Sequence, residues 1–343
     1  MGGLSRRFVK MEELREAGKD PIIVDAGDLF FSTKNLNQTN IASEKHRAAA
    51  MLNGYSKIGC DAINIGHFEL VGGRSFIREM KDEYGLPFIS ANLKDPKTNE
   101  LVYKPNLLVQ RGDLTIGITG VTDKLPDSSK SFIADDYIEV GKKQIQTLKT
   151  KADIVVILVN SNRQTHELLP SEFEEADFIV TSGSTNMTRT NTAQRDGGPN
   201  LYSCGKQGKY MLILDVDKKN GKDPFVDIST FETKIKSINK RFERLQKKDP
   251  DKSLDEIYQN QKNVMNLIEK YRGELAEAET KVEDATNIIK FQTVGLNKKI
   301  QDDPDILSFV NESLATCSML NPKKKNNVKT KGKKDPHEGH NHD

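Results

Sequence analysis

Polar side chains with metal-binding chemistry occur where several apolar runs of the sequence end. Asp28 closes the motif Asp-Ala-Gly-Asp after one apolar run, and His67 lies in the segment 62–70, AINIGHFEL. Asn160 ends a third run. Carboxylates, amides and a histidine form the ligand set of a divalent ion such as Zn, Mn, Mg or Ca. Such an ion would polarise a phosphoryl oxygen and lower the pKa of its bound water.

A working dinuclear centre requires more ligands than these positions supply. Two-metal sites hold their ions roughly 4 Å apart and use a carboxylate that bridges them. We therefore expect Asp28, His67 and Asn160 to be the candidate metal ligands, for a divalent metal that is bound partially or not at all. The residues assign no catalytic group and no site for another cofactor.

The first 230 residues alternate between strand and helix patterns, and these elements would position the polar residues. Short β-branched runs that stop at turn residues are typical of strands, and apolar residues at spacings of three and four indicate amphipathic helices. Strands that alternate with helices indicate an α/β domain, whose polar groups gather at the carboxyl ends of the strands. The expected helices are residues 4–17, 43–58, 73–83, 138–150 and 164–175, and the expected strands lie within residues 21–28, 61–66, 86–93, 106–121, 152–160, 176–183, 200–205 and 210–217.

Residues 231–290 form a polar segment that predicts an appended helical arm. Asp249-Pro250 should end one helix, and Ser253 with Glu256 forms a capping-box pattern that should open a second. Two series in the second helix recur every seven residues, which indicates a heptad seam of about four repeats. The seam would pack in a long helical hairpin, or it would mediate self-association as a coiled coil through residues 254–282. The series are Leu254, Gln261, Ile268, Leu275 and Val282, and Ile257, Val264, Tyr271 and Ala278.

The last part of the chain divides into two pieces. Residues 291–320 should add a short strand and a helix that return to the domain. Residues 321–343 should be a disordered tail, because they hold the basic run PKKKNNVKTKGKK and few apolar residues. The tail ends in HEGHNHD, whose histidines at 337, 340 and 342 would bind a metal adventitiously, since a flexible tail does not fix its ligands.

Composition narrows the classes of partner. The chain has 343 residues, 35% of them hydrophobic, which allows a sizeable core. A formal net charge of +2 does not indicate a nucleic-acid partner. The three cysteines are far apart, so they suggest neither a zinc knuckle nor a disulfide framework. No apolar run approaches the ~20 residues of a membrane span, and the first residues lack the apolar core of a secretion signal.

The order of motifs resembles the N-terminal calcineurin-like metallophosphoesterase domain of the 5'-nucleotidase family. The resemblance covers residues 2–230 and rests on DAGDLFF, GCDAINIGHFEL, LPFISANL, YKPNLLVQRGDLTIGITGVTD, ADIVVILVN, ADFIVTSGSTN and NLYSCGKQGKYMLILDVD. It implies a four-layer αββα sandwich in residues 1–230 with a dinuclear metal centre at the strand ends. Residues 231–290 would be the arm, and nothing in the chain resembles the family's C-terminal domain that stacks the nucleobase.

Carried over residue by residue, the resemblance implies a degenerate site. Asp28 matches the family's bridging aspartate. The family's Gly-Asn-His-Glu is here Gly66-His67-Phe68-Glu69, so a ligand becomes His67 and the histidine that assists the leaving group becomes Phe68. The family's Ser-His after the strand VVIL is here Val159-Asn160, and its Gly-His-x-His is the segment 182–185, Ser-Gly-Ser-Thr.

The family also opens with a strand that carries Asp-x-His just upstream of GGLSRR, and this chain begins after it. If an upstream segment encoded that strand together with a signal peptide, the protein would be periplasmic or extracytoplasmic; otherwise we expect it to be cytoplasmic.

Three functions stay open on the sequence. The first is a metallophosphoesterase-fold protein with a degraded phosphoester hydrolase site, acting as a binding or scaffold module. The second is an active metal-dependent phosphoesterase with altered ligands, whose substrate would be a nucleotide or another phosphomonoester. The third is a coiled-coil structural protein. The expected partners are a phosphoester ligand and a protein partner or a second copy of the chain.

Overall fold

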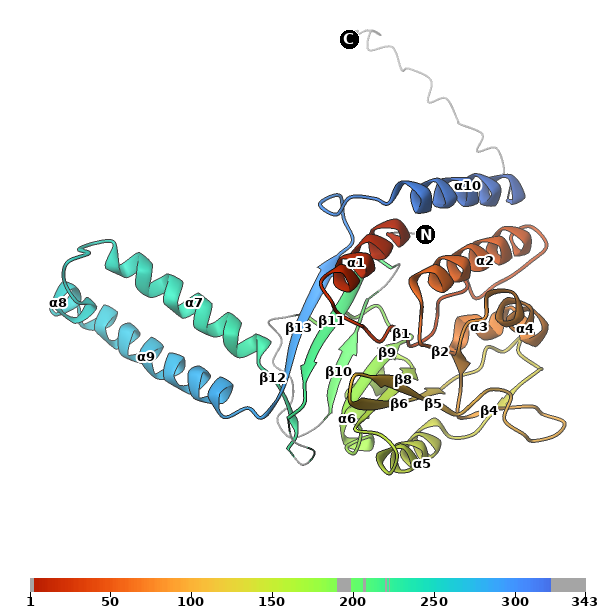
Figure 1. The fold of residues 1–343 in the computed structure, drawn as a ribbon, viewed down its shortest axis with the longest axis horizontal. Helices are drawn as coiled ribbons and strands as arrows, with labels where there is room; N and C mark the ends of the chain where they lie inside the picture. Colours follow the sequence, from red (N-terminus) through yellow and green to blue (C-terminus); the bar gives the residue numbers. More distant parts are fainter. Residues whose placement is uncertain (1–2, 190–198, 206–207, 220, 222, 322–343) are drawn as a thin grey trace, which may run out of the picture.

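The computed structural model describes residues 3–189, 199–205, 208–219, 221 and 223–321. Within these residues the chain forms an α/β body from which two long helices project (Figure 1). The tail expected over residues 321–343 lies outside the described residues from position 322 onward, including its three histidines. Among the described helices, none combines the length and the apolar character that crossing a membrane requires.

Two layers of β-structure lie at the centre of the body. The first layer is a five-stranded sheet in the order β10-β9-β8-β6-β5, parallel except for the β5–β6 hairpin. The second layer contains the parallel sheet β1-β2-β3 and the sheet β11-β13-β12, and β4 pairs with β7 separately. The bounds are β1 Val24–Asp25, β2 Ala62–Asn64, β3 Phe88–Ile89, β4 Leu93–Lys94, β5 Asn106–Arg111, β6 Leu114–Thr122, β7 Ile133–Ala134, β8 Ile154–Asn160, β9 Phe178–Ser182, β10 Asn200–Ser203, β11 Tyr210–Asp217, β12 Phe225–Asp227 and β13 Asn287–Gly295.

Three apolar cores define four layers. The central core lies between the sheets, where Ile118 and Leu158 of the five-stranded sheet meet Ala62 of β2 and Phe291 of β13. A second core packs α5 and α6 on the outer face of the five-stranded sheet. The third packs α1, α2, α4 and α10 on the outer face of the other layer. The expected αββα sandwich is therefore confirmed.

The helices of the body match most of the expected ones. The bounds are α1 Leu4–Glu16, α2 Ile41–Ile58, α3 His67–Val71, α4 Gly73–Tyr84, α5 Tyr137–Lys149, η1 Arg163–Thr165, α6 Leu169–Glu172 and α10 Pro304–Leu320. The helix expected over residues 164–175 is wrong as one element, because it is divided into η1 and α6. Pro170 lies in the first turn of α6, where its missing N–H costs nothing, whereas in the middle of a longer helix it would remove a hydrogen bond.

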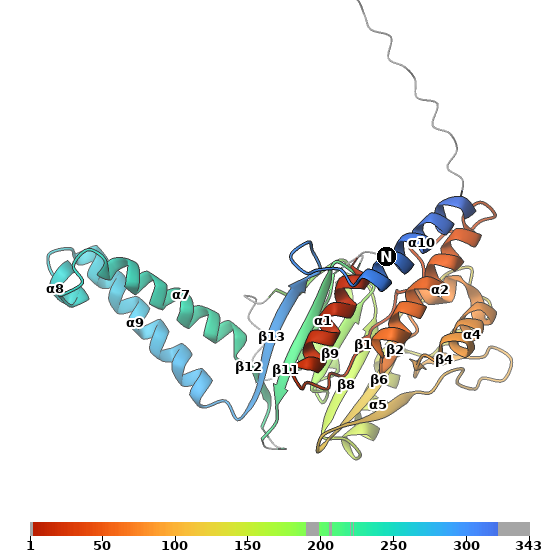
Figure 2. The ribbon, with the colours of Figure 1, turned by 45° about the horizontal axis from the view of Figure 1, so that its top comes forward.

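The last helix returns to the body, as Figure 2 shows. α10 lies beside α2 and α1, and Ser43 of α2 donates a hydrogen bond to the carbonyl oxygen of Cys317 at 2.9 Å. Arg6 of α1 forms an ion pair with Asp302 at 2.8 Å, just before α10 begins.

The projecting arm consists of α7 Ser229–Gln246, α8 Leu254–Tyr258 and α9 Lys262–Glu283. The capping box of Ser253 and Glu256 is present at the start of α8. The single long helix expected after it is wrong, because the chain breaks between α8 and α9. The Tyr258 hydroxyl donates to the carbonyl oxygen of Leu245 at 3.1 Å, and Arg272 pairs with Asp255 through two bonds of 2.8 and 2.9 Å. These contacts fold α8 back on its neighbours.

The apolar seam of α9 packs against α7 of the same chain. Ile268 of α9 is fully buried and Ile238 of α7 is 3% exposed. The rings of Phe242 and Tyr271 meet edge to face, with centroids 6.2 Å apart. The heptad residues of α9 thus pair α9 with α7, and self-association through residues 254–282 stays a prediction.

We expect Ile268→Asp to unfold the arm without unfolding the body. An unpaired carboxylate at this buried position should cost about 3 to 5 kcal/mol, whereas the arm's other contacts are mostly partly exposed. Far-ultraviolet circular dichroism should show lost helix, and limited proteolysis should cut residues 229–283 first. Asn266→Asp places the same group on an exposed position of α9 and should change neither signal; equal behaviour of both variants would contradict the packing described here.

Candidate metal centre at the strand ends

The strand-end residues of the two sheets converge at one place. The backbone N–H of His67 donates to Asn160 Oδ1 at 2.9 Å, and the N–H of Phe68 donates to Asp28 Oδ1 at 2.9 Å. The two sheets meet here, since Asn160 ends β8 whereas the other residues follow β1 and β2. The structure thus brings together Asp28, His67 and Asn160, and their role as metal ligands stays a prediction.

Glu69 is the hydrogen-bonding hub of the site. Its side chain is fully buried and accepts four backbone N–H groups, from Asp28, Leu29, Phe30 and Gly66, at 2.6 to 3.0 Å. Burial raises the pKa of Glu69, and the Asp28 carboxylate adds to the increase, whereas the backbone N–H donors oppose it and favour the ionised form. The sequence motif contains Glu69, but it does not show that this residue joins the loops after β1 and β2. The spacing of Gly66 and Glu69, which is that of a capping box at the start of a helix, is the sequence pattern that could have indicated this role.

Asn160 is engaged through both ends of its amide. Its oxygen accepts the His67 N–H, and its Nδ2 donates to Ser182 Oγ at 2.7 Å. Ser182 Oγ in turn donates to the carbonyl oxygen of Ala26 at 2.7 Å. If the amide were turned the other way, its NH₂ group would face the His67 N–H, and two donors cannot form a hydrogen bond. The network therefore determines the orientation of the Asn160 amide.

Asp28 has a left-handed backbone, with a φ of 67° that is uncommon for a residue other than glycine. Burial raises the pKa of Asp28, while the Phe68 N–H and the Asn160 side chain oppose the increase. Gly27 before it has a φ of 102°, and a Cβ there would lie 2.8 Å from the nitrogen of Gly66. Close approach of the two loops therefore requires glycine.

His67 presents only part of its ring to the site. Its Nδ1 lies 3.1 Å from the carbonyl oxygen of Lys124, a contact that requires the proton on Nδ1. The ring of Phe68 stands edge to face against it at 5.7 Å. Nε2 is the ring nitrogen that stays available as a ligand.

This donor set does not fit the dinuclear centre that the family resemblance implies. The amide oxygen of Asn160 and one oxygen of Asp28 already accept backbone N–H groups, and the amide of Asn160 directs its NH₂, which cannot bind a cation, toward Ser182. The described part of the chain contains no group of three or more histidine, cysteine or acidic side chains placed to hold an ion.

A buried polar chain next to the site was not anticipated from the sequence. Arg7 of α1 donates to the Tyr55 hydroxyl at 2.8 Å, and that hydroxyl donates to Asp25 Oδ2 at 2.9 Å. Asp25 opens the motif Asp-Ala-Gly-Asp; this chain occupies one of its oxygens, and the Gly27 N–H donates to the other at 2.9 Å. Helix spacing gave no sign that Arg7 and Tyr55 would meet Asp25.

We expect Glu69→Gln to destabilise the body by about 3 kcal/mol or more. The amide replaces one acceptor oxygen by NH₂, so two backbone N–H groups lose their acceptor and face another donor. Denaturant unfolding measures the free energy, and Glu79→Gln on the exposed face of α4 is the matched control, expected within about 0.5 kcal/mol of the original chain.

We also expect acid to destabilise the protein through His166. This residue is 7% exposed, and its Nε2 lies 3.2 Å from the carbonyl oxygen of Ser161. Burial lowers the pKa of His166 from 6.5, despite opposing backbone hydrogen bonds, so the unfolded chain binds a proton at a pH where the folded chain does not. This contribution to stability is therefore present above pH 6.5 and is lost as the pH falls below it.

The test compares the unfolding free energies of the original chain and of His166→Gln, whose side chain is not protonated in this range, between pH 7 and pH 5. As the pH falls, the original chain should lose stability relative to the variant. A difference that stays constant over this range would contradict a neutral buried His166.

Comparisons with known proteins agree with the layered architecture. No family model matches the chain. Human 5'-nucleotidase is 25% identical over 227 residues, which cover 63% of this chain and 37% of that protein. A 5'-nucleotidase of Vibrio parahaemolyticus is 22% identical over 345 residues, covering 87% of this chain and 60% of that protein. The chain thus spans 37% of the length of the first relative and 60% of the second.

A solved structure extends the likeness to nearly the whole described chain. The calcineurin-like phosphoesterase YfkN from Bacillus subtilis superimposes with a TM-score of 0.59 at 14% identity, covering 93% of this chain and 90% of that one. The αββα layers and this superposition show a metallophosphoesterase fold, and the motif order with the sequence similarity to 5'-nucleotidases supports a domain of that family.

Proposed function

We propose that the chain is a metallophosphoesterase-fold protein whose phosphoester hydrolase site is degraded, and that it acts as a binding or scaffold module. The observation that carries this proposal is the use of the strand-end polar atoms by the protein itself. Asn160, Ser182 and Glu69 form hydrogen bonds within the chain, and these bonds hold the loops of the two sheets together.

The chemistry of the remaining groups supports the same proposal. Phe68 is an apolar ring at the position where the family resemblance implies an acid, so no side chain there could protonate a leaving group. Loss of one general acid or base typically lowers a rate by ~10²- to 10⁴-fold even where other catalytic groups stay. Asp28 and His67 would bind an ion through few atoms, which favours weak or partial binding over a stable pair of ions.

The helical arm is the interaction element of this proposal. It projects from the body in both views (Figures 1 and 2), so a partner could contact α9 without approaching the strand ends. Leu267 is 41% exposed on α9, outside the seam that packs on α7. A protein partner or a second copy of the chain is therefore the proposed occupant. A coiled-coil structural protein that associates through residues 254–282 is a separate alternative.

The main alternative is an active metal-dependent phosphoesterase with altered ligands. Two observations favour it: the relatives are named 5'-nucleotidases, and His67 is close enough to Asp28 to influence its pKa. A phosphomonoester would then be the substrate. A periplasmic or extracytoplasmic location belongs to either proposal through the family resemblance alone.

Metal content and turnover separate the two proposals. We expect the purified chain to retain less than one divalent ion per molecule by mass spectrometry after dialysis against Zn²⁺ or Mn²⁺. Hydrolysis of phenyl phosphate should be the same for the original chain and for Asp28→Ala. Asp113→Ala, in the exposed turn between β5 and β6, is the matched control for an aspartate removed elsewhere.

Two bound ions per chain, with hydrolysis that disappears in Asp28→Ala and persists in Asp113→Ala, would overturn the degraded-site proposal in favour of the active phosphoesterase.

A further inference from the structure

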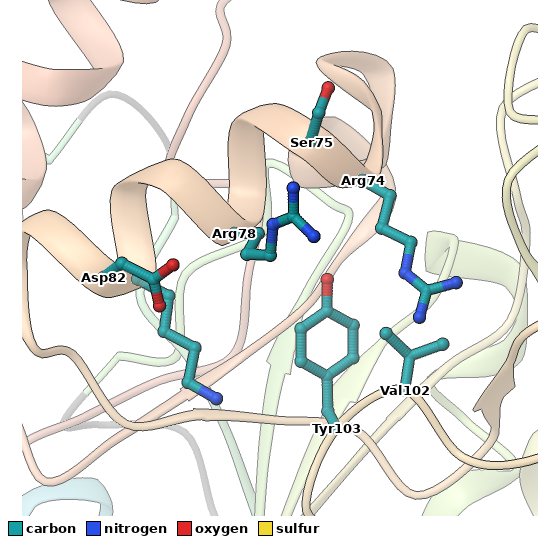
Figure 3. A pocket seen from close by; sticks show the side chains of 7 residues that line it. Arg74, Ser75, Arg78, Asp82, Val102 and Tyr103 are labelled. Atoms are coloured by element: carbon teal, nitrogen blue, oxygen red, sulfur yellow. The ribbon is translucent and has the colours of Figure 1, made fainter.

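A pocket of about 560 Å³ lies between α4 and the segment that precedes β5 (Figure 3). Its lining residues are Arg74, Ser75, Arg78, Lys81, Asp82, Val102 and Tyr103. None of them belongs to the strand-end site, and the volume is in the range of small-molecule sites. The pocket is therefore a separate feature of the body.

The pocket wall formed by α4 is basic. Arg74, Arg78 and Lys81 follow one another at spacings of four and three residues, which places them on one face of the helix. Arg74 is engaged by an ion pair with Asp95. Arg78 and Lys81 form no ion pair with any residue that the structure describes. Against these three cations the lining holds one acidic side chain, Asp82.

Tyr103 supplies a buried donor on the opposite wall. It is only 9% exposed, and its ring stacks on Phe132 with centroids 6.3 Å apart. Its hydroxyl has no hydrogen-bond partner in the described part of the chain. Figure 3 shows that hydroxyl directed into the pocket, toward the space between the guanidinium groups of Arg78 and Arg74. Burial also raises the pKa of Tyr103, so the hydroxyl stays a neutral donor.

The Tyr103 hydroxyl is available to a ligand. It opens onto the pocket, whereas most of the residue is buried. Here the donor points at the same space as two guanidinium groups, one of them without a partner carboxylate. The two guanidinium groups can only donate and the Tyr103 hydroxyl can donate as well, so the complementary ligand carries several acceptor oxygens and negative charge.

We propose that this pocket binds the phosphate group of a small phosphorylated molecule. A guanidinium fork matches two phosphate oxygens, and the Tyr103 hydroxyl supplies a third donor from the other side. Val102 and the Tyr103 ring offer an apolar surface to the ester substituent. The inference goes beyond the proposed function, because it requires neither a metal nor hydrolysis and uses none of the strand-end residues.

Phenylphosphonate is the probe that tests this site, because its P–C bond is not cleaved by a phosphoesterase. Isothermal titration calorimetry on the full chain should detect binding, and inorganic phosphate should bind more weakly because it lacks the ring that covers Val102. Equal affinities for the two probes would assign the site to free phosphate and overturn the phosphorylated-molecule proposal.

Variants identify the residues that bind. We expect Arg78→Gln to lower the affinity for phenylphosphonate about tenfold or more. Tyr103→Phe, which removes only the hydroxyl, should lower this affinity several-fold. Lys143→Gln on α5 removes the same charge from the opposite helical layer and should change nothing. Circular dichroism checks that each variant is folded.

The proposal fails if the chain does not bind phenylphosphonate at millimolar concentration, or if Arg78→Gln and Tyr103→Phe bind it as well as the original chain. It also fails if Lys143→Gln loses as much affinity as Arg78→Gln, since binding would then follow net charge alone. These outcomes are independent of the turnover experiment, because they measure binding of a compound that is not hydrolysed.

Discussion

The carboxyl group of Glu69 is the interaction on which the strand-end region depends. It lies in the interior without solvent contact and collects the N–H groups of Asp28, Leu29, Phe30 and Gly66. A buried carboxyl group is costly unless donors satisfy it, and buried backbone N–H groups need acceptors, so each side of this arrangement requires the other. As a consequence, the loop after β1 and the loop after β2 are fixed relative to each other.

The same constraint bears on the degraded-site proposal for the strand ends. In a metal centre the ion holds the loops together and the ligand oxygens point at it. Here the loops are held by hydrogen bonds, from His67 to Asn160, from Asn160 to Ser182 and from Ser182 to Ala26, and those bonds use the atoms that an ion would need. Under the degraded-site proposal, the network keeps the architecture of the region at the expense of its ligand capacity.

The arm and the basic pocket show two different uses of helix periodicity. In α9 the repeating apolar face is used within the chain, because α7 lies alongside and buries Ile268. In α4 one face packs into the core through Phe76 and Ile77, while the other carries Arg78 and Lys81 toward the pocket. A seam that is buried needs no partner molecule, whereas converging charges without counterions favour one.

The sequence by itself determined the layered α/β class, because buried apolar runs that alternate with amphipathic helices have few ways to cover both faces of a sheet. It also placed Asp28, His67 and Asn160 at strand ends, since the carboxyl ends of parallel strands share an edge. The break between α8 and α9 was not predictable from heptads, because it depends on Tyr258 reaching Leu245 and Arg272 reaching Asp255 across the turn.

Only the tertiary structure decided what the strand-end atoms do. Whether an amide oxygen binds an ion or an N–H depends on which backbone group lies within 3 Å, and residues 67 and 160 are 93 positions apart in the chain. The pocket was undetectable for the same reason: Tyr103 has no helical relation to Arg78, and it meets that helix only because the segment before β5 passes along α4. Residue types and periodicity are local properties, whereas the satisfaction of a buried donor or acceptor is decided by distant parts of the chain that folding brings together.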